Sequence, residues 1–373
     1  MALDSAATVD PAEEIEHLAP ALRSDRSLAE RFRRFAAEEC SEASDEGAGS
    51  RTYEILSEAV AVDPALKGLA RRCRVGQPIP NLFFAAVKRT AAFFPGSGLA
   101  EHYRRIAAGD GPTAGLEQAF TEFARAHRDQ IVGYLESRMV QTNEVGRCAY
   151  LLPGFLTIAA ENPGLPLALL DVGASAGLNL NWDQYRYRYS TGDEFGPANS
   201  RVVIECDARN GLPELPTAFP EVSFRVGIDL APVNLGDDEE YRWMQALVWP
   251  EHRERAAALS SARDVWIHSR PTVLQGDTVE LLPTTLRDIP EDSALCVFHC
   301  HTLNQFPAAA RERFADILRT ESMERVVYHI PSEGERVSLR KIVGGTAETL
   351  LTARRQVHGK WIAWDTDIRV SAE

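Results

Sequence analysis

The stretch that most constrains the fold is LALLDVGASAG, at residues 167–177. Residues 167–170 are all apolar, without the alternation of a strand that has one face in water, and the run ends at Asp171. Such a run is typical of a strand covered on both faces, as in a parallel sheet. The glycine-rich turn after it predicts a sharp bend of the backbone or a close approach to another group.

Further strand-like segments follow this one along the chain. They are residues 223–232, 271–282, 293–307, 323–334 and 360–370. Helix-forming stretches separate several of them, and strands that alternate with helices are typical of α/β proteins. We therefore expect a doubly wound, mostly parallel α/β sheet, Rossmann-like in architecture, in a domain over residues 161–373.

The first part of the chain has a different pattern. Apolar side chains recur at helical spacing, as at Leu28, Phe32 and Phe35, and no clear strand is found. We expect an all-helical N-terminal domain over residues 1–160 that acts as a lid or shapes a substrate pocket. The small, acidic segment at residues 40–50 predicts a mobile loop.

Two insertions are expected in the second domain, at about residues 182–222 and 233–265. The first contains YRYRYS (185–190), in which tyrosine and arginine alternate with the period of a strand. We expect it to pair with RVVIECDAR (201–209) as an inserted β-hairpin. Two interpretations stay open, a solvated hairpin with packed tyrosines and a flap over an active cleft.

Charge and composition exclude some classes of protein. With 40 basic and 54 acidic residues the formal charge is −14, which argues against a general nucleic-acid binder. No apolar run approaches the roughly 20 residues that cross a bilayer, and the first residues lack the pattern of a signal peptide. Six scattered cysteines without a C-x-x-C pair predict reduced thiols. We expect a cytoplasmic protein that binds neither nucleic acid nor membrane.

The pentapeptide GASAG (173–177) fits two chemistries, of which the first is a nucleophile elbow. In that interpretation Ser175 is the nucleophile of an α/β hydrolase, with Asp277 and a later histidine as its partners. The histidines available are His299, His301 and His329. Against it, Asp171 would place a negative charge near the forming oxyanion, and no H-G-G-G motif comes earlier in the chain.

The second chemistry is a glycine-rich cofactor loop after a parallel strand. Later strands should then end in acids at the same edge, and Asp229 and Asp277 stand at such ends. The segment FHCHTLNQF (298–306) would deliver substrate-facing residues from the next strand. Because ligands of open α/β sheets bind at the carboxyl ends of the strands, this ordered series favours the cofactor loop.

The order LLDVGASAG, VGIDLAP, QGDTVE, CVFHCHTL resembles the class I S-adenosylmethionine-dependent methyltransferases. In that family the glycine loop cradles the methionine part of the cofactor, the second acid binds the ribose and the third contacts the adenine. The resemblance implies S-adenosyl-L-methionine as cofactor. The cofactor-binding residues that it implies are Asp171, Gly173, Ser175, Gly177, Asp229 and Asp277. Ser175 stands where the family usually has glycine.

A second resemblance covers most of residues 140–335. VQTNEVGRCAYLLPGF (140–155), followed by the first strand, is similar to a bacterial family of unknown function. Its members carry a helical N-terminal half before a methyltransferase-like half. The family brings no established reaction with it.

The identity of the ribose acid stays open. Gly177 and Asp229 lie farther apart than the roughly 20 residues expected in a compact unit, which the insertion would explain. If residues 202–207 form the second strand instead, Glu205 or Asp207 takes this role.

Methyl transfer needs an aligned acceptor and in some cases a base. His299 and His301, two residues apart near a strand end, are the candidate catalytic residues. They could also be packing residues, or half of a metal site for which no third ligand has clear spacing. Candidate substrate-binding residues are Asn143, Glu144, Arg147, Tyr185 and Glu333. For these, capping and packing are the alternatives.

Three functions follow as hypotheses. The first is an S-adenosylmethionine-dependent methyltransferase that acts on a small-molecule acceptor. The second is a protein of the same fold that binds S-adenosylmethionine or a nucleoside without methyl transfer. The third and most distant is the hydrolase with Ser175 as nucleophile. Neither the acceptor nor the oligomeric state follows from the sequence.

Overall fold

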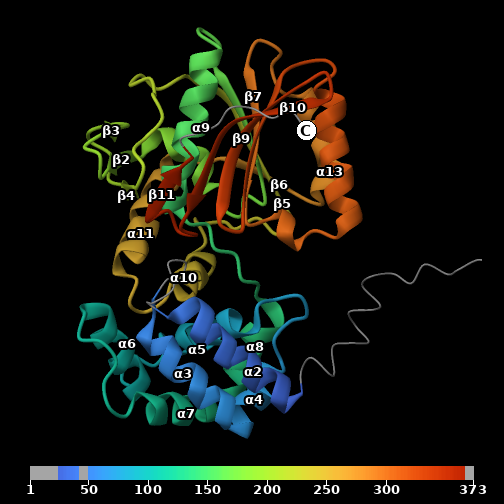
Figure 1. Cartoon of the computed structure of the whole chain (residues 1–373). Coiled ribbons are helices and arrows are strands. Elements are labelled where there is room, and N and C mark those ends of the chain that lie inside the picture. The colour runs from blue at the N-terminus through green and yellow to red at the C-terminus, as the bar shows by residue number, and fades with distance from the viewer. Residues whose placement is uncertain (1–23, 42–48, 366–373) are drawn as a thin grey trace, which may run out of the picture. The chain divides into compact units, whose positions relative to one another are not determined.

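The computed structural model describes residues 24–41 and 49–365 (Figure 1). The chain divides into two compact units. The helical unit comprises the residues up to 141 together with 242–253, and the sheet unit comprises 142–241 together with the residues from 254 on. The expected loop at residues 40–50 and the expected strand at 360–370 lie partly outside the described residues.

This division differs from the expected boundary at residue 160. Helix α9 (Cys148–Glu161) belongs to the sheet unit because it packs on the strands of the sheet. The segment 242–253, expected as part of an insertion in the second domain, belongs to the helical unit.

The helical unit consists of short helices. They are α2 (Asp25–Phe35), the π-helix η1 (Ala36–Cys40), α3 (Arg51–Val62), α4 (Pro64–Ala70), α5 (Ile79–Ala91), α6 (Gly98–Ala108), α7 (Leu116–Ala126) and α8 (Arg128–Ser137). The hydroxyls of Ser24, Ser50 and Ser97 each accept a hydrogen bond from a first-turn N–H, which begins α2, α3 and α6. The apolar pattern of 116–131 is divided between α7 and α8, because His127 leaves the helical conformation.

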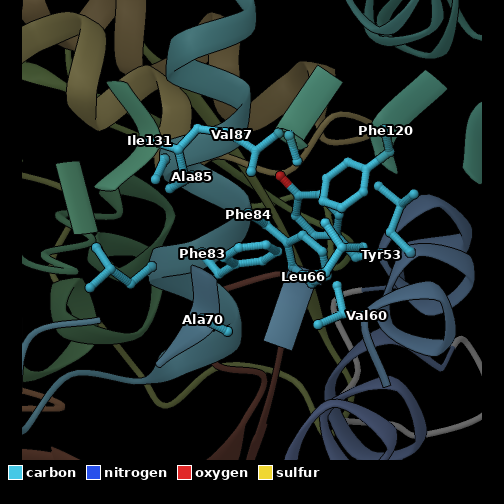
Figure 2. Close-up of a cluster of buried hydrophobic side chains, with 14 of the residues drawn as sticks. Tyr53, Val60, Leu66, Ala70, Phe83, Phe84, Ala85, Val87, Phe120 and Ile131 are labelled. Atoms are coloured by element: carbon cyan, nitrogen blue, oxygen red, sulfur yellow. The ribbon is translucent and has the colours of Figure 1, made fainter. Parts of the chain in front are cut away.

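An aromatic cluster forms the core of the helical unit (Figure 2). The rings of Tyr53 and Phe84 are stacked with centroids 4.4 Å apart. Trp249, from the segment 242–253, packs its ring against Phe35 and Tyr53 at 5.5 Å from each. The segment 242–253 therefore contributes to the same core as the N-terminal helices.

The sheet unit contains one eleven-stranded sheet in the order β3-β2-β4-β11-β10-β9-β8-β7-β1-β5-β6. The strands are β1 (Leu167–Val172), β2 (Arg186–Tyr189), β3 (Glu194–Phe195), β4 (Val203–Ala208), β5 (Val222–Asp229), β6 (Thr272–Gln275), β7 (Ala294–Cys300), β8 (Val327–Glu333), β9 (Arg336–Val343), β10 (Thr346–Arg355) and β11 (Trp361–Trp364). The remaining helices are η2 (Val145–Arg147), η3 (Leu178–Gln184), α11 (Arg253–His268), α12 (Thr278–Arg287), η4 (Leu303–Gln305) and α13 (Ala308–Glu321). Helix α10 (Asp238–Leu247) begins in the sheet unit and ends in the helical unit.

Five neighbouring strands, β6, β5, β1, β7 and β8, are parallel. All six residues of β1 are buried, as its unbroken apolar run predicts. Helices α12 and α13 pack on one face through Leu282 and Phe314, and α9 packs on the other, where Phe155 contacts Phe298. Figure 1 labels α9 and α13 beside the sheet. The predicted mixed α/β sheet and the predicted N-terminal helical region are confirmed at this level.

The doubly wound pattern ends after β8. Strands β9, β10 and β11 continue the sheet as antiparallel neighbours, without helices between them. β9 alternates buried and exposed side chains over part of its length, which is typical of an antiparallel strand with one face toward solvent.

The expected hairpin of 185–190 with 201–209 is wrong in its direction. β2 does pair with β4, but in parallel, with Tyr187 opposite Ile204. The antiparallel partner of β2 is the short β3, because the chain reverses at Gly192 (φ 92°) and then returns to run along β2 a second time. The tyrosines of β2 are buried, and Arg186 and Arg188 pair with Glu194. The packed interpretation of this insertion is the one that the burial favours.

Candidate site at the carboxyl ends of the parallel strands

The parallel strands place several polar residues at one edge of the sheet. Val172, the last residue of β1, lies opposite Ile228 of β5 and His299 of β7, and His299 lies opposite Pro331 of β8. In open α/β sheets this edge binds ligands.

The glycine-rich turn after β1 has an unusual backbone. Gly173, Ser175 and Gly177 have φ values of 75°, 54° and 76°, in the left-handed region that favours glycine. A Cβ atom on Gly173 would lie 2.3 Å from Oγ1 of Thr302, and one on Gly177 would lie 2.6 Å from Cγ of Pro271. Both glycines are therefore required by conformation and by contacts within the protein.

Asp229 holds this turn from the neighbouring strand. Its Oδ2 accepts a hydrogen bond from the N–H of Ser175 at 2.7 Å, and its Oδ1 accepts one from Ala231 at 2.8 Å. Glu205 and Asp207 lie on β4, and five strands, namely β11, β10, β9, β8 and β7, stand between β4 and β1. Of the three acids, Asp229 is the one brought to the glycine turn.

Asp171 is buried at the end of β1, with 2 % of its surface exposed. Its Oδ2 has no hydrogen-bond partner among the described residues, and neither has the hydroxyl of Ser175. Burial raises the pKa of Asp171 well above its usual range, the charge of Asp229 adds to this, and Arg147 opposes it. A buried carboxyl without a partner is costly, so it is suited to meeting a cationic or hydrogen-bond-donating group.

Asp277 occupies a different position. It is exposed and forms the N-cap of α12, where its Oδ1 accepts a hydrogen bond from Val279 at 2.7 Å. Its neighbour Gly276 donates its N–H to the carbonyl of Asp229 at 3.0 Å. Asp277 therefore lies next to the sheet edge at which Asp229 stands.

His299 belongs to a buried chain of polar groups. Its Nδ1 lies 2.7 Å from Oε1 of Glu333, and its Nε2 lies 3.1 Å from Nε2 of His329. The same Glu333 oxygen also accepts hydrogen bonds from the N–H groups of Thr302 and Leu303. Burial alone would raise the pKa of Glu333, but these hydrogen bonds hold it below its usual value. Burial lowers the pKa of His329 far below its usual value.

His301 does not share a face with His299. β7 ends at Cys300, and His301 has a φ of 57°, so the alternation of the strand is lost there. Its Nε2 is buried without a partner among the described residues. Burial, together with Arg147 and Arg355, lowers the pKa of His301 to about 3. The imidazole is therefore uncharged at neutral pH.

The residues of the expected substrate set have structural contacts of their own. Oδ1 of Asn143 accepts a hydrogen bond from Leu178 at 2.8 Å, and Glu144 caps η2 and pairs with Arg255. The hydroxyl of Tyr185 donates to the carbonyl of Leu178 at 2.7 Å. Arg147 donates to the carbonyls of Thr142 and Val357, each at 3.3 Å. Asn143 and Tyr185 thus support the segment after the glycine turn, while Arg147 and Glu333 lie nearer to the strand ends.

Three residues of this region were not named as candidates from the sequence: Thr302, Tyr150 and Arg355. Thr302 lies within the segment 298–306 that was expected to deliver substrate-facing residues. Thr302 covers Gly173, and Arg355 stacks over Tyr150 with Cζ 4.9 Å from the ring centre. Arg355 ends β10, which the sequence reasoning did not identify as a strand. The Gly344-Gly345 pair between two polar-apolar stretches was the available signal, since such pairs are typical of hairpin turns.

Neither a metal cluster nor a membrane-spanning helix is found in the described ranges. No group of three or more histidine, cysteine, aspartate or glutamate side chains is arranged there to hold a metal ion. Nor does any helix in those ranges have the length and apolar character that would let it cross a membrane.

Fold and site together define a mixed α/β protein whose polar residues gather at the carboxyl ends of its parallel strands. Over residues 29–364 the chain matches the family described as "Uncharacterized protein conserved in bacteria (DUF2332)", and it belongs to that family. The predicted membership of a bacterial family of unknown function is confirmed. Comparison with curated proteins and with solved structures gave no match.

Proposed function

We propose that this protein is an S-adenosylmethionine-dependent methyltransferase that acts on a small-molecule acceptor. The observation that carries the proposal is the hydrogen bond from the N–H of Ser175 to Asp229, which joins the glycine turn of β1 to the acid at the end of the adjacent β5. β1 lies between β5 and β7, where the chain order of the parallel strands reverses. This is the switch point at which open α/β sheets bind nucleotide-like ligands.

The residues at the switch point fit the charges of the cofactor. The amino group of S-adenosylmethionine would neutralise Asp171, whose Oδ2 is buried and without a partner. Asp229, at the end of the strand next to β1, holds the glycine turn through the N–H of Ser175 and is the acid that would lie beside the ribose hydroxyls. The buried hydroxyl of Ser175 offers a further polar contact. Asp277, which follows β6, is the residue that would lie beside the adenine.

When bound, the cofactor supplies an electrophilic methyl group, and the protein has to align an acceptor nucleophile with it. Neither expected histidine is well suited to remove a proton. Both nitrogens of His299 are engaged by Glu333 and His329. The low pKa of His301, about 3, makes it a weak base at neutral pH. We therefore assign His301 a role in orienting the acceptor.

The same observation supports a second candidate, a protein that binds S-adenosylmethionine or a nucleoside without transferring a methyl group. Turnover distinguishes the two candidates, and binding is common to both. The more distant hydrolase interpretation has little support, because Nε2 of His299 contacts His329 and no histidine bonds to Ser175 among the described residues.

Isothermal titration calorimetry with S-adenosylhomocysteine tests the proposal. We expect the unaltered protein to bind, Asp229→Asn to lose binding by about ten-fold or more, and Asp207→Asn to bind normally. Asp207 is the matched control because it is an exposed acid at a strand position on β4. A folded protein that does not bind S-adenosylhomocysteine would contradict the cofactor assignment.

A further inference from the structure

Arg355 is a buried cation whose hydrogen-bonding groups are largely unused. Only 1 % of the residue is exposed. Its Nε donates to the hydroxyl of Ser332 at 2.9 Å, whereas both terminal nitrogens of the guanidinium are buried without a partner among the described residues. A guanidinium carries five N–H donors, and the four on these terminal nitrogens meet no acceptor in the described ranges.

A second arginine and a histidine lie close by. Arg147 donates to the carbonyl of Val357, two residues after Arg355. The N–H of His301 donates to the carbonyl of Ser332, the residue whose hydroxyl meets Arg355. Burial lowers the pKa of His301, and the positive charges of both arginines lower it further. Arg355 lies on the face of the sheet that α9 covers, because it stacks over Tyr150 of that helix. His301 is joined to the same region through the backbone of Ser332.

The region holds two arginines and two acids. Asp171 interacts electrostatically with Arg147, and Glu333 interacts electrostatically with His301. Neither arginine forms an ion pair within the part of the chain that the structure describes. Arg147 also precedes the first residue of α9, and no side chain caps this helix. The N-terminus of a helix of 14 residues adds a partial positive charge.

We propose that Arg355, Arg147 and His301 form a binding site for an oxyanion, a carboxylate or a phosphate group carried by the methyl acceptor. A planar guanidinium that lacks a protein acceptor matches two oxygens of such a group at once. An oxyanion would satisfy the unused donors and compensate the buried charge. The assignment to the acceptor rests on the proposed function, whereas the anion site itself does not.

The test measures binding of inorganic phosphate and of acetate to the full chain, without any S-adenosyl compound. We expect one or both salts to raise the melting temperature above that in sodium chloride of equal ionic strength. Phosphate alone would indicate a phosphorylated acceptor, and acetate alone a carboxylic acid. Arg355→Gln should weaken the binding on the order of 30-fold or more. The matched control is Arg325→Gln, since Arg325 already donates to the carbonyls of Ile289, Pro290 and Ser293.

A measurement on the unaltered protein keeps the test valid even if Arg355→Gln fails to fold. The imidazole NMR signals of His301 should shift when the bound salt is added, because an anion nearby raises its pKa. If neither salt gives a stabilisation beyond that of chloride and His301 does not respond, the anion site is wrong.

Competition with S-adenosylhomocysteine separates this inference from the proposed function. Simultaneous binding of the salt and S-adenosylhomocysteine supports an acceptor site. Mutual exclusion would mean that the arginines hold the carboxylate of the cofactor itself, and would overturn the assignment to the acceptor. If the salt binds and S-adenosylhomocysteine does not, the anion site is supported and the proposed methyltransferase function is contradicted.

Discussion

The carboxylate of Asp229 and the backbone N–H of Ser175 are joined by a hydrogen bond of 2.7 Å between two segments 54 residues apart. Ser175 has a left-handed backbone, which is unfavourable for serine, and Asp229 is one of the contacts that hold it there. The second carboxylate oxygen accepts from Ala231. One side chain thus fixes the turn after β1 and the turn after β5 together.

We expect Asp229→Ala to lower the free energy of unfolding by about 1–3 kcal/mol, because two largely buried N–H groups lose their acceptor. Ser175→Gly is the companion variant. It keeps the N–H and removes the cost of the left-handed backbone, so it should be as stable as the unaltered protein or more stable. Denaturant titration followed by circular dichroism measures both. Equal losses in the two variants would contradict this account of the turn.

Asp171→Asn should stabilise the ligand-free protein and weaken its binding of S-adenosylhomocysteine. Burial and the charge of Asp229 raise the folded-state pKa of Asp171, so above the ordinary pKa of an aspartate this group favours the unfolded chain, and a neutral amide removes that cost. The same amide cannot neutralise the amino group of the cofactor. Melting temperature and calorimetry are the two readouts. A variant that melts lower in the absence of ligand would contradict the destabilising role of this carboxylate.

Gly173→Ala tests the close approach of Thr302. The new methyl group would meet Oγ1 of Thr302 at 2.3 Å and would also sit at a φ of 75°. Gly164→Ala is the matched control, because its φ is 87° and no atom lies within 4 Å of the new methyl group. We expect the control to lose about 1 kcal/mol and Gly173→Ala to lose about 2–4 kcal/mol. Adding Thr302→Ala to Gly173→Ala should recover part of the difference.

The stability of the protein should fall as the pH is lowered from about 6.5 toward 3. In the unfolded chain His301 takes up a proton near its ordinary pKa of about 6.5, whereas in the folded protein it does so only near about 3. The unfolded state therefore binds more protons in this window, and protonation favours unfolding. His301→Gln should reduce the slope by up to about 1.4 kcal/mol per pH unit, as measured by denaturant titrations at several pH values. An unchanged slope would contradict the low pKa.

Trp249→Ala should destabilise the helical unit by about 3–5 kcal/mol, because the ring packs on Phe35 and Tyr53 in the core. Val62→Ala, at a position 61 % exposed in the same unit, should change the stability by less than about 0.5 kcal/mol. Calorimetric melting of each variant gives the comparison. Similar melting curves for the two variants would mean that residues 242–253 do not support this core.

The sequence predicted the features that depend on short-range pattern. The apolar run of β1 identified a strand buried on both faces, and the helical spacing of Leu28, Phe32 and Phe35 identified a buried stripe. The direction of β4 was not predictable in this way, because alternation shows which face a side chain takes and not which way the partner strand runs. Only the tertiary path of the chain, which turns back at Gly192, decides that direction.

Only some residues of the polar site could be predicted from the sequence. Asp171 and Asp229 could be identified because each ends a strand-like segment. Arg355 could not, because it lies on the antiparallel extension of the sheet and meets Ser332 only through the pairing of β8, β9 and β10. Likewise, the burial that lowers the pKa of His301 comes from residues distant in sequence, and no local pattern records it.

The helical unit is assembled from two separate segments of the chain. Its core can therefore be completed only after the second segment has been synthesised. Residues 242–253, which carry Trp249, are synthesised after β1 and β5. At a translation rate of roughly 5–20 residues per second, the N-terminal helices wait for about 5–20 seconds before that segment leaves the ribosome. During this interval the core of the N-terminal helices lacks Trp249 and its neighbours. The nascent chain therefore presents an apolar surface that chaperones can recognise until residues 242–253 have been synthesised.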